Sequence, residues 1–75
     1  MSVIIYSTPT CPWCHKAKEY LASKNISYED VDVSVDDIRA QEMVKKSGQM
    51  GVPVLDINGK VVVGFDQLAI DEALL

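Results

Sequence analysis

Two cysteines carry the most reactive side chains of this 75-residue chain, and only Pro12 and Trp13 separate Cys11 from Cys14. An apolar run at 3–6 precedes them, and a helical pattern of apolar residues follows. Cys11 is therefore expected at the start of a helix, where unpaired N–H groups and the helix dipole favour a thiolate. Cys14, one turn later, can attack a mixed disulfide on Cys11 and release the partner. The spacing predicts thiol–disulfide exchange, with Cys11 as nucleophile and Cys14 as resolving thiol.

A structural disulfide is the competing interpretation of this pair. Closing so short a loop stabilises a fold by only roughly 2 kcal/mol. The sequence starts without a basic and apolar leader, and no apolar run is long enough to cross a membrane. We therefore expect a cytoplasmic protein without membrane partners. Permanent disulfides are rare in that compartment, which favours the redox interpretation.

The charge balance restricts the partners. Acidic residues outnumber basic ones by 11 to 7, which gives a net charge of −4. Nucleic-acid binding needs a basic surface, so that function is not expected. Lys16, Lys18 and Lys24 follow the second cysteine. They are expected on a solvated helix face, but lysines can also stabilise a nearby thiolate, and the sequence leaves both interpretations open.

The chain is long enough for a single domain with a small core, which we place at residues 1–75. Apolar and β-branched runs predict strands, and apolar spacings of three and four predict helices. Pro12 marks the first turn of the first helix and Asn25 its end, while Ser34 caps the second helix and Gly48 ends it. The expected strands are 3–7, 26–33, 52–57 and 60–63, and the expected helices are 12–25, 34–48 and 67–74.

The element order βαβαββα predicts an α/β domain. The first βαβ unit pairs two parallel strands through a right-handed crossover. Asn58-Gly59 is a strong hairpin signal and adds an antiparallel pair. The result is a four-stranded mixed sheet flanked by three helices. Cys11 follows the carboxyl end of the first strand, where open α/β sheets usually carry their chemistry.

Three motifs, in this order and over essentially the whole chain, resemble the glutaredoxins and NrdH-type redoxins of the thioredoxin superfamily. They are Cys11-Pro12-Trp13-Cys14, Gly51-Val52-Pro53 and Gly64-Phe65-Asp66. The resemblance implies a thioredoxin-like fold and a small, monomeric thiol–disulfide oxidoreductase that reduces protein disulfides. A reversible Cys11–Cys14 disulfide would then serve in place of a bound cofactor, and no metal ligand is expected.

The resemblance also implies a substrate site around the cysteines. Pro12 and Trp13 would tune the pair, since Pro12 stiffens the turn and an exposed Trp13 could pack on the substrate. A cis Pro53 would bring Val52 beside Cys11 and leave the Val52 backbone free to bind an extended peptide.

The last motif is expected to complete this groove through Gly64, Phe65 and Asp66. Asp66 also suits the N-cap of the final helix, because its side chain can accept a hydrogen bond from a helical N–H group.

Departures from the glutaredoxin pattern bear on the reductant. Members that use glutathione usually carry a basic residue where this chain has Thr8, and threonine where it has Gly51. They also usually have a Gly-Gly pair where this chain has Val63-Gly64 followed by Phe65, and that difference resembles the NrdH-type redoxins. Thioredoxin reductase is therefore the predicted reductant, with a glutathione-dependent glutaredoxin as the alternative. Ribonucleotide reductase and a peroxidase are the candidate disulfide substrates.

The sequence gives weaker support for other functions of the two-cysteine motif. Cys11-x-x-Cys14-His15 matches the signature for covalent haem attachment, but the strand that precedes it and the missing leader argue against a cytochrome. Structural zinc needs four ligands, more than two cysteines and one histidine supply. An iron–sulfur cluster shared between two chains, a property of some glutaredoxins, remains the alternative binding function.

Overall fold

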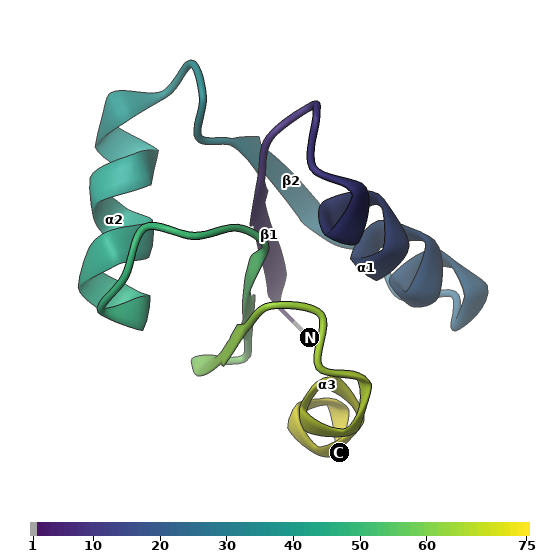
Figure 1. The fold of residues 1–75 in the computed structure, drawn as a ribbon. Coiled ribbons are helices and arrows are strands. Elements are labelled where there is room, and N and C mark those ends of the chain that lie inside the picture. The colour runs from purple at the N-terminus through teal and green to yellow at the C-terminus, as the bar shows by residue number, and fades with distance from the viewer. Residues whose placement is uncertain (1) are drawn as a thin grey trace.

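The computed structural model describes residues 2–75 and has the predicted element order (Figure 1). The sheet has strand order β2-β1-β3-β4, with β1 parallel to β2 and antiparallel to β3, and β3 antiparallel to β4. The predicted four-stranded mixed sheet with three helices is thereby confirmed. Its elements are β1 (Val3–Ser7), α1 (Pro12–Ser23), β2 (Glu29–Asp32), α2 (Asp37–Ser47), β3 (Val54–Ile57), β4 (Lys60–Val63) and α3 (Gln67–Leu74).

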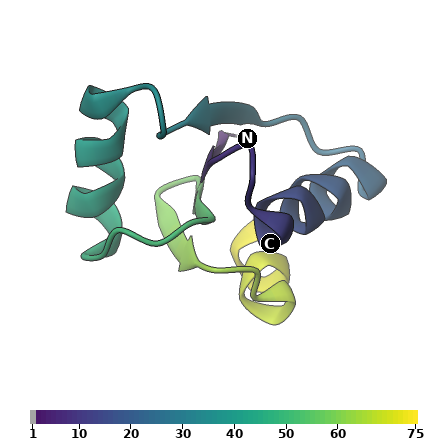
Figure 2. The ribbon, with the colours of Figure 1, turned by 45° about the horizontal axis from the view of Figure 1, so that its top comes forward.

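Helices cover both faces of the sheet. Figures 1 and 2 show α1 and α3 on one side of the strands and α2 on the other. Ile5, Leu21 and Ile70 belong to the core between the sheet and the pair α1 and α3, whereas Tyr6 and Met43 belong to the core beneath α2. Full burial of one such aliphatic side chain contributes about 1.5–3 kcal/mol, so the first core holds α1 and α3 on the sheet and the second holds α2.

The second strand, β2, is shorter than the predicted 26–33. The first residues of the predicted range still belong to the turn that ends α1. Asn25 adopts the left-handed conformation with φ 58°, as expected of a residue that ends a helix. The N–H of Ile26 then donates to the carbonyl of Leu21 at 3.0 Å. Ile26 and Tyr28 therefore pack on the core from a loop, and pairing with β1 starts only at Glu29.

The cap of α2 also differs from the prediction. Asp36, not Ser34, is the N-cap, and its carboxylate accepts a hydrogen bond from the Arg39 N–H at 3.0 Å. Ser34 belongs instead to the preceding turn, where its hydroxyl donates to Asp32 at 2.5 Å. Both residue types suit a cap, and the turn decides which one is used.

The third strand starts at Val54 rather than at 52, since Val52 and Pro53 form a turn before the pairing with β1 begins. Within residues 2–75, no helix is both long and apolar enough to span a bilayer.

Candidate active site

Cys11 is the N-cap of α1, as predicted. Its backbone is extended, with φ −95° and ψ 109°, and its Sγ accepts a hydrogen bond from the N–H of Cys14 at 3.1 Å. Pro12 occupies the first helical turn, where its missing N–H costs nothing. The Cys11 sulfur thus faces the first turn of α1, where backbone N–H groups have no partner within the helix.

Cys14 has the opposite environment. Its side chain is fully buried, while Cys11 is partly exposed. Burial raises the pKa of Cys14 to about 11, and the hydrogen bond with Cys11 contributes in the same direction. Cys14 is therefore a neutral thiol at physiological pH. The two sulfurs are adjacent but unequal, as a nucleophile and a resolving thiol must be.

Val52 lies beside Cys11, as predicted. The Val52–Pro53 peptide bond is cis, and the Val52 carbonyl oxygen lies 3.9 Å from the Sγ of Cys11. Pro53 is buried, whereas Val52 is half-buried. The structure therefore brings a backbone acceptor and the partly exposed sulfur together from segments far apart in the sequence.

Gly64 and Phe65 extend this neighbourhood. Gly64 has φ 80°, a conformation that favours glycine, and its N–H donates to the Pro53 carbonyl at 2.8 Å. The rings of Trp13 and Phe65 are 6.4 Å apart between centroids, and Trp13 is 57% exposed. Together with Val52, these residues line a mostly apolar hollow of about 240 Å³.

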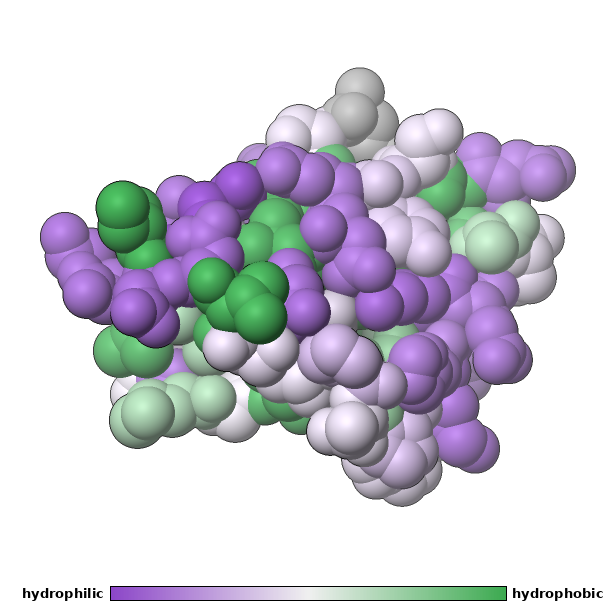
Figure 3. Space-filling view, turned by 90° about the horizontal axis from the view of Figure 1, so that it is seen from above, coloured by the Kyte–Doolittle hydropathy of each residue, from purple (hydrophilic) through white to green (hydrophobic). Residues whose placement is uncertain are grey.

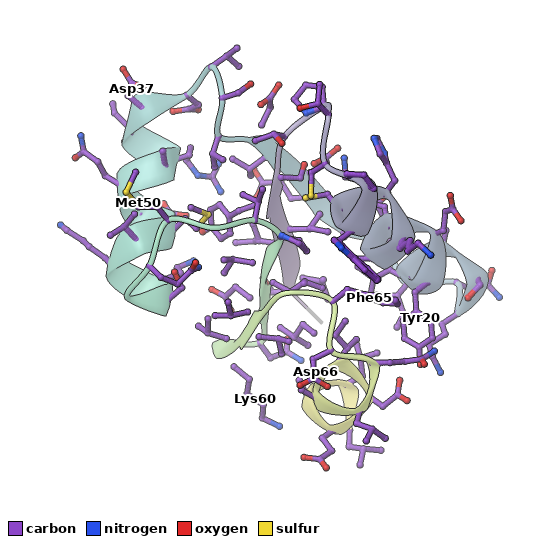
Figure 4. All side chains as sticks on the ribbon, viewed as in Figure 1. Tyr20, Asp37, Met50, Lys60, Phe65 and Asp66 are labelled. Atoms are coloured by element: carbon purple, nitrogen blue, oxygen red, sulfur yellow. The ribbon has the colours of Figure 1, made fainter. Side chains whose placement is uncertain are left out.

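Asp66 is placed differently from its two neighbours in the motif. Its carboxylate accepts a hydrogen bond from the Ala69 N–H at 3.1 Å, so its predicted role as N-cap of α3 is confirmed. It does not line the hollow beside Phe65. Figure 4 shows Asp66 at the start of α3, and a role in the groove remains a prediction.

A wider hollow of about 500 Å³ lies along α2, lined by Asp37, Gln41 and Met50 among others. Figure 4 places Asp37 and Met50 on the α2 side of the molecule, away from Phe65. In the face shown in Figure 3, apolar side chains appear as separate spots among polar ones. The hollow lined by Trp13, Val52 and Phe65 is therefore the one next to the contact between Cys11 and Val52.

Two contacts around the site were not predicted. His15 Nε2 donates to the Pro9 carbonyl at 3.0 Å and so ties the loop before Cys11 to α1. Phe65 also packs edge-on against Tyr20, with centroids 5.8 Å apart. The Phe65–Tyr20 contact joins segments far apart in the sequence and so has no local signal, whereas the His15–Pro9 contact spans six positions and depends on the path of the loop before α1.

Two lysines of α1, Lys16 and Lys18, contact different partners. Lys16 Nζ lies 5.2 Å from the centroid of the Trp13 ring, a cation–π contact. Lys18 Nζ forms an ion pair with Asp30 at 2.7 Å, and its positive charge lowers the pKa of Cys14 against the larger effect of burial. Of these two lysines, Lys18 is therefore the one whose charge acts on the Cys14 thiol, and its effect is smaller than that of burial.

Among residues 2–75, no group of three or more histidine, cysteine, aspartate or glutamate side chains is arranged to hold a metal ion.

Comparison with known proteins agrees with the geometry. Residues 3–62 match the family model of the glutaredoxins. A glutaredoxin-like 8.6 kDa protein from the rubredoxin operon of Clostridium pasteurianum is 54% identical over 70 residues, which cover 93% of each chain. Glutaredoxin 3 of Escherichia coli K12 is 37% identical over 67 residues, covering 89% of this chain and 81% of that protein. The crystal structure of the thioredoxin-like protein BC3987 matches with a TM-score of 0.90 at 30% identity, covering 97% of this chain and 100% of that one.

Proposed function

The chain belongs to the glutaredoxin family of small thiol–disulfide oxidoreductases, and from this premise we propose that it reduces protein disulfides by a dithiol mechanism. Cys11 is the proposed nucleophile and Cys14 the resolving thiol. One observation carries the proposal: the Sγ of the partly exposed residue Cys11 accepts a hydrogen bond from the N–H of the fully buried Cys14 at 3.1 Å. In this proposal a partner protein reaches the sulfur of Cys11 directly, and the sulfur of Cys14 lies one helical turn behind it.

The reaction then proceeds in two displacements. The Cys11 thiolate attacks one sulfur of the substrate disulfide, a mixed disulfide forms, and the other substrate sulfur leaves as a thiolate. Cys14 loses its proton and attacks the Sγ of Cys11, which releases the second substrate thiolate and forms the Cys11–Cys14 disulfide. Two electrons pass from the cysteine pair to the substrate, and the released thiolates take up protons from solvent.

The substrate segment is proposed to bind beside Val52. An extended peptide could use the backbone of Val52, as a strand added to a sheet edge would. Trp13 and Phe65 offer apolar contacts from the hollow of about 240 Å³. Pro12 limits the freedom of the turn that carries Cys11.

Thioredoxin reductase is the proposed reductant, and glutathione is the alternative. Glutathione carries two carboxylates, and the position where glutathione-using relatives usually have a basic residue is Thr8. Phe65 contributes bulk where those relatives usually have a glycine pair, and it packs against Trp13 and Tyr20. Both features favour a protein surface over a small anionic peptide as electron donor.

The remaining proposals concern setting and partners. We propose that residues 1–75 act as one monomeric domain in the cytoplasm, where reducing conditions keep both thiols available. Ribonucleotide reductase and a peroxidase are the proposed classes of disulfide substrate.

One comparison tests the reductant. The oxidised protein is mixed either with NADPH and thioredoxin reductase, or with NADPH, glutathione and glutathione reductase, and NADPH consumption is followed. We expect faster reduction in the first mixture. Faster reduction in the second mixture would identify glutathione, and not thioredoxin reductase, as the reductant. No reduction in either mixture would overturn the proposed activity.

A second experiment tests the roles of the two cysteines. Cys14→Ser should accumulate mixed disulfides between Cys11 and disulfide-containing proteins, visible as higher-mass species that dithiothreitol removes. Cys11→Ser should form none. Equal trapping by both variants would contradict the assignment.

A further inference from the structure

Lys18 lies four residues after Cys14 on α1, so the two side chains share one face of the helix. Its side chain is only 18% exposed, unusually low for a lysine, and its Nζ is 2.7 Å from Asp30 Oδ2. Most of the Lys18 side chain is therefore covered by protein, on the same side of α1 as Cys14.

Asp30 is itself held in place. The hydroxyl of Ser7, which is 2% exposed, donates to Asp30 Oδ1 at 2.7 Å. Burial alone would raise the pKa of Asp30, but hydrogen bonds from Lys18 and Ser7 outweigh it and lower that pKa. Asp30 is thus an anion at neutral pH with both oxygens occupied. Ser7 on β1, Asp30 on β2 and Lys18 on α1 form a chain of contacts that fixes a flexible side chain.

We propose that Ser7 and Asp30 position the Lys18 ammonium so that it promotes ionisation of Cys14 in the resolving step. Lys18 is a positioning residue, since it acts through Cys14 and touches neither substrate nor the reacting sulfur of Cys11. The inference rests on the dithiol mechanism proposed above.

The resolving step needs such help because Cys14 must lose its proton before it attacks. Burial and the hydrogen bond with Cys11 raise the pKa of Cys14, whereas the Thr8 backbone and the Lys18 charge lower it. Lys18 is therefore a side chain that opposes burial, although its effect on the Cys14 pKa is smaller than that of burial, of Cys11 or of the Thr8 backbone. Asp30, its ion-pair partner on β2, partly offsets the Lys18 charge, so we expect a modest effect.

The size of the effect follows from two opposing trends. Removing a nearby opposite charge raises a pKa by about one unit at the low end of the usual range. One unit decreases the thiolate fraction about tenfold, but the more basic thiolate is about threefold more nucleophilic. The resolving step should therefore slow about threefold when the Lys18 charge is removed.

The two displacements can be measured separately with dithiobis(nitrobenzoate), an aromatic disulfide that releases a yellow thiolate. The reduced protein is mixed with one equivalent in a stopped-flow instrument. Attack by Cys11 releases the first coloured thiolate, and attack by Cys14 on the mixed disulfide releases the second. Lys18→Gln should leave the first rate unchanged and slow the second about threefold at neutral pH.

Three further variants make the test specific. Lys18→Met keeps the apolar stem of the side chain, should behave as Lys18→Gln does, and covers the case in which glutamine destabilises the fold. Lys18→Arg keeps the charge and should restore the second rate. Lys45→Gln makes the same change in net charge on α2, across the sheet, and should change neither rate.

The pH profile distinguishes an electrostatic role from a structural one. The second rate should rise with pH in every variant, and its rise should shift to higher pH only where the Lys18 charge is lost. Normal second rates in Lys18→Gln and Lys18→Met would overturn the inference and leave the dithiol mechanism intact. Release of only one thiolate by the unmodified protein would instead overturn the proposed function itself.

Discussion

The carbonyl oxygen of Val52 lies 3.9 Å from the Sγ of Cys11, although 41 positions separate the two residues. The contact joins the start of α1 to the segment before β3. A substrate peptide that binds the Val52 backbone would therefore meet the sulfur of Cys11, the proposed nucleophile, without a movement of the fold. The rim of aromatic side chains formed by Trp13 and Phe65 lies next to this contact.

Because Cys11 is partly exposed and Cys14 is fully buried, the two thiols should be modified by reagents in a defined order. At neutral pH, iodoacetamide should label Cys11 first, since a thiol with a pKa of about 11 is ionised to only about one part in ten thousand. Cys11→Ser should consequently react very slowly, and its rate should rise steeply toward pH 11. Mass spectrometry of the labelled peptides measures both rates. Equal labelling of Cys11→Ser and Cys14→Ser at neutral pH would contradict this order.

Cys14 should also make the stability of the reduced protein depend on alkaline pH. Its pKa in the folded state is about 11, above the ordinary value of 9.0, so the folded state holds the proton more tightly than the unfolded state. The resulting stability is complete below pH 9 and is lost as pH rises toward 11. Urea unfolding should therefore show a decrease on the order of 2 kcal/mol over this interval.

Cys14→Ala is the matched variant for this measurement. It removes the titrating group, so the slope of unfolding free energy against pH between 9 and 11 should become smaller. An unchanged slope would assign the alkaline loss to other groups, such as Tyr6, whose pKa burial also raises.

Asp66 offers a test that separates capping from substrate binding. Asp66→Ala removes the acceptor for the Ala69 N–H and should lower the free energy of unfolding by about 1 kcal/mol. Asp66→Ser keeps a capping oxygen and should retain most of that stability. Thermal unfolding measures both. If Asp66 also contacts substrate, Asp66→Ser should still reduce protein disulfides more slowly, despite its intact cap.

Phe65 is expected to influence the choice of reductant. Phe65→Ala removes the ring that packs between Trp13 and Tyr20 and should enlarge the hollow beside Val52. We expect reduction by thioredoxin reductase to slow and the glutathione-dependent rate to rise relative to it. Leu68→Ala, at a 77% exposed position on α3, is the control and should change neither rate. A constant ratio of the two rates in Phe65→Ala would exclude this residue as a determinant of specificity.

Local sequence patterns predicted the elements that begin and end on strong signals. The strands at 3–7 and 60–63 and the helix at 67–74 have the predicted bounds, because apolar runs there meet turn residues or a capping aspartate. The segment 26–33 was predicted too long, since Ile26 and Tyr28 face the core from a loop and so imitate a strand pattern. Alternation alone cannot distinguish the two cases.

The candidate site was predictable in part. The position of Cys11 at a helix start followed from spacing, but its contact with Val52 came from the family resemblance, since no local pattern joins such distant segments. The pairing of Lys18 with Asp30 was missed for the same reason, because it depends on how α1 packs on the sheet. The hydrogen bond from His15 to Pro9 spans only six positions and was missed because it depends on the path of the loop before α1.

The separation of the helices onto two faces of the sheet has a practical use. α2 packs against the side opposite α1, and its exposed Gln41 and Lys45 point to a hollow away from the thiols. A fluorophore, a biotin or a surface linker attached at Lys45 would therefore keep its tether on the far side of the molecule. Immobilised in this way, the protein would present its reactive sulfur outward, ready for capture of unknown disulfide partners from solution.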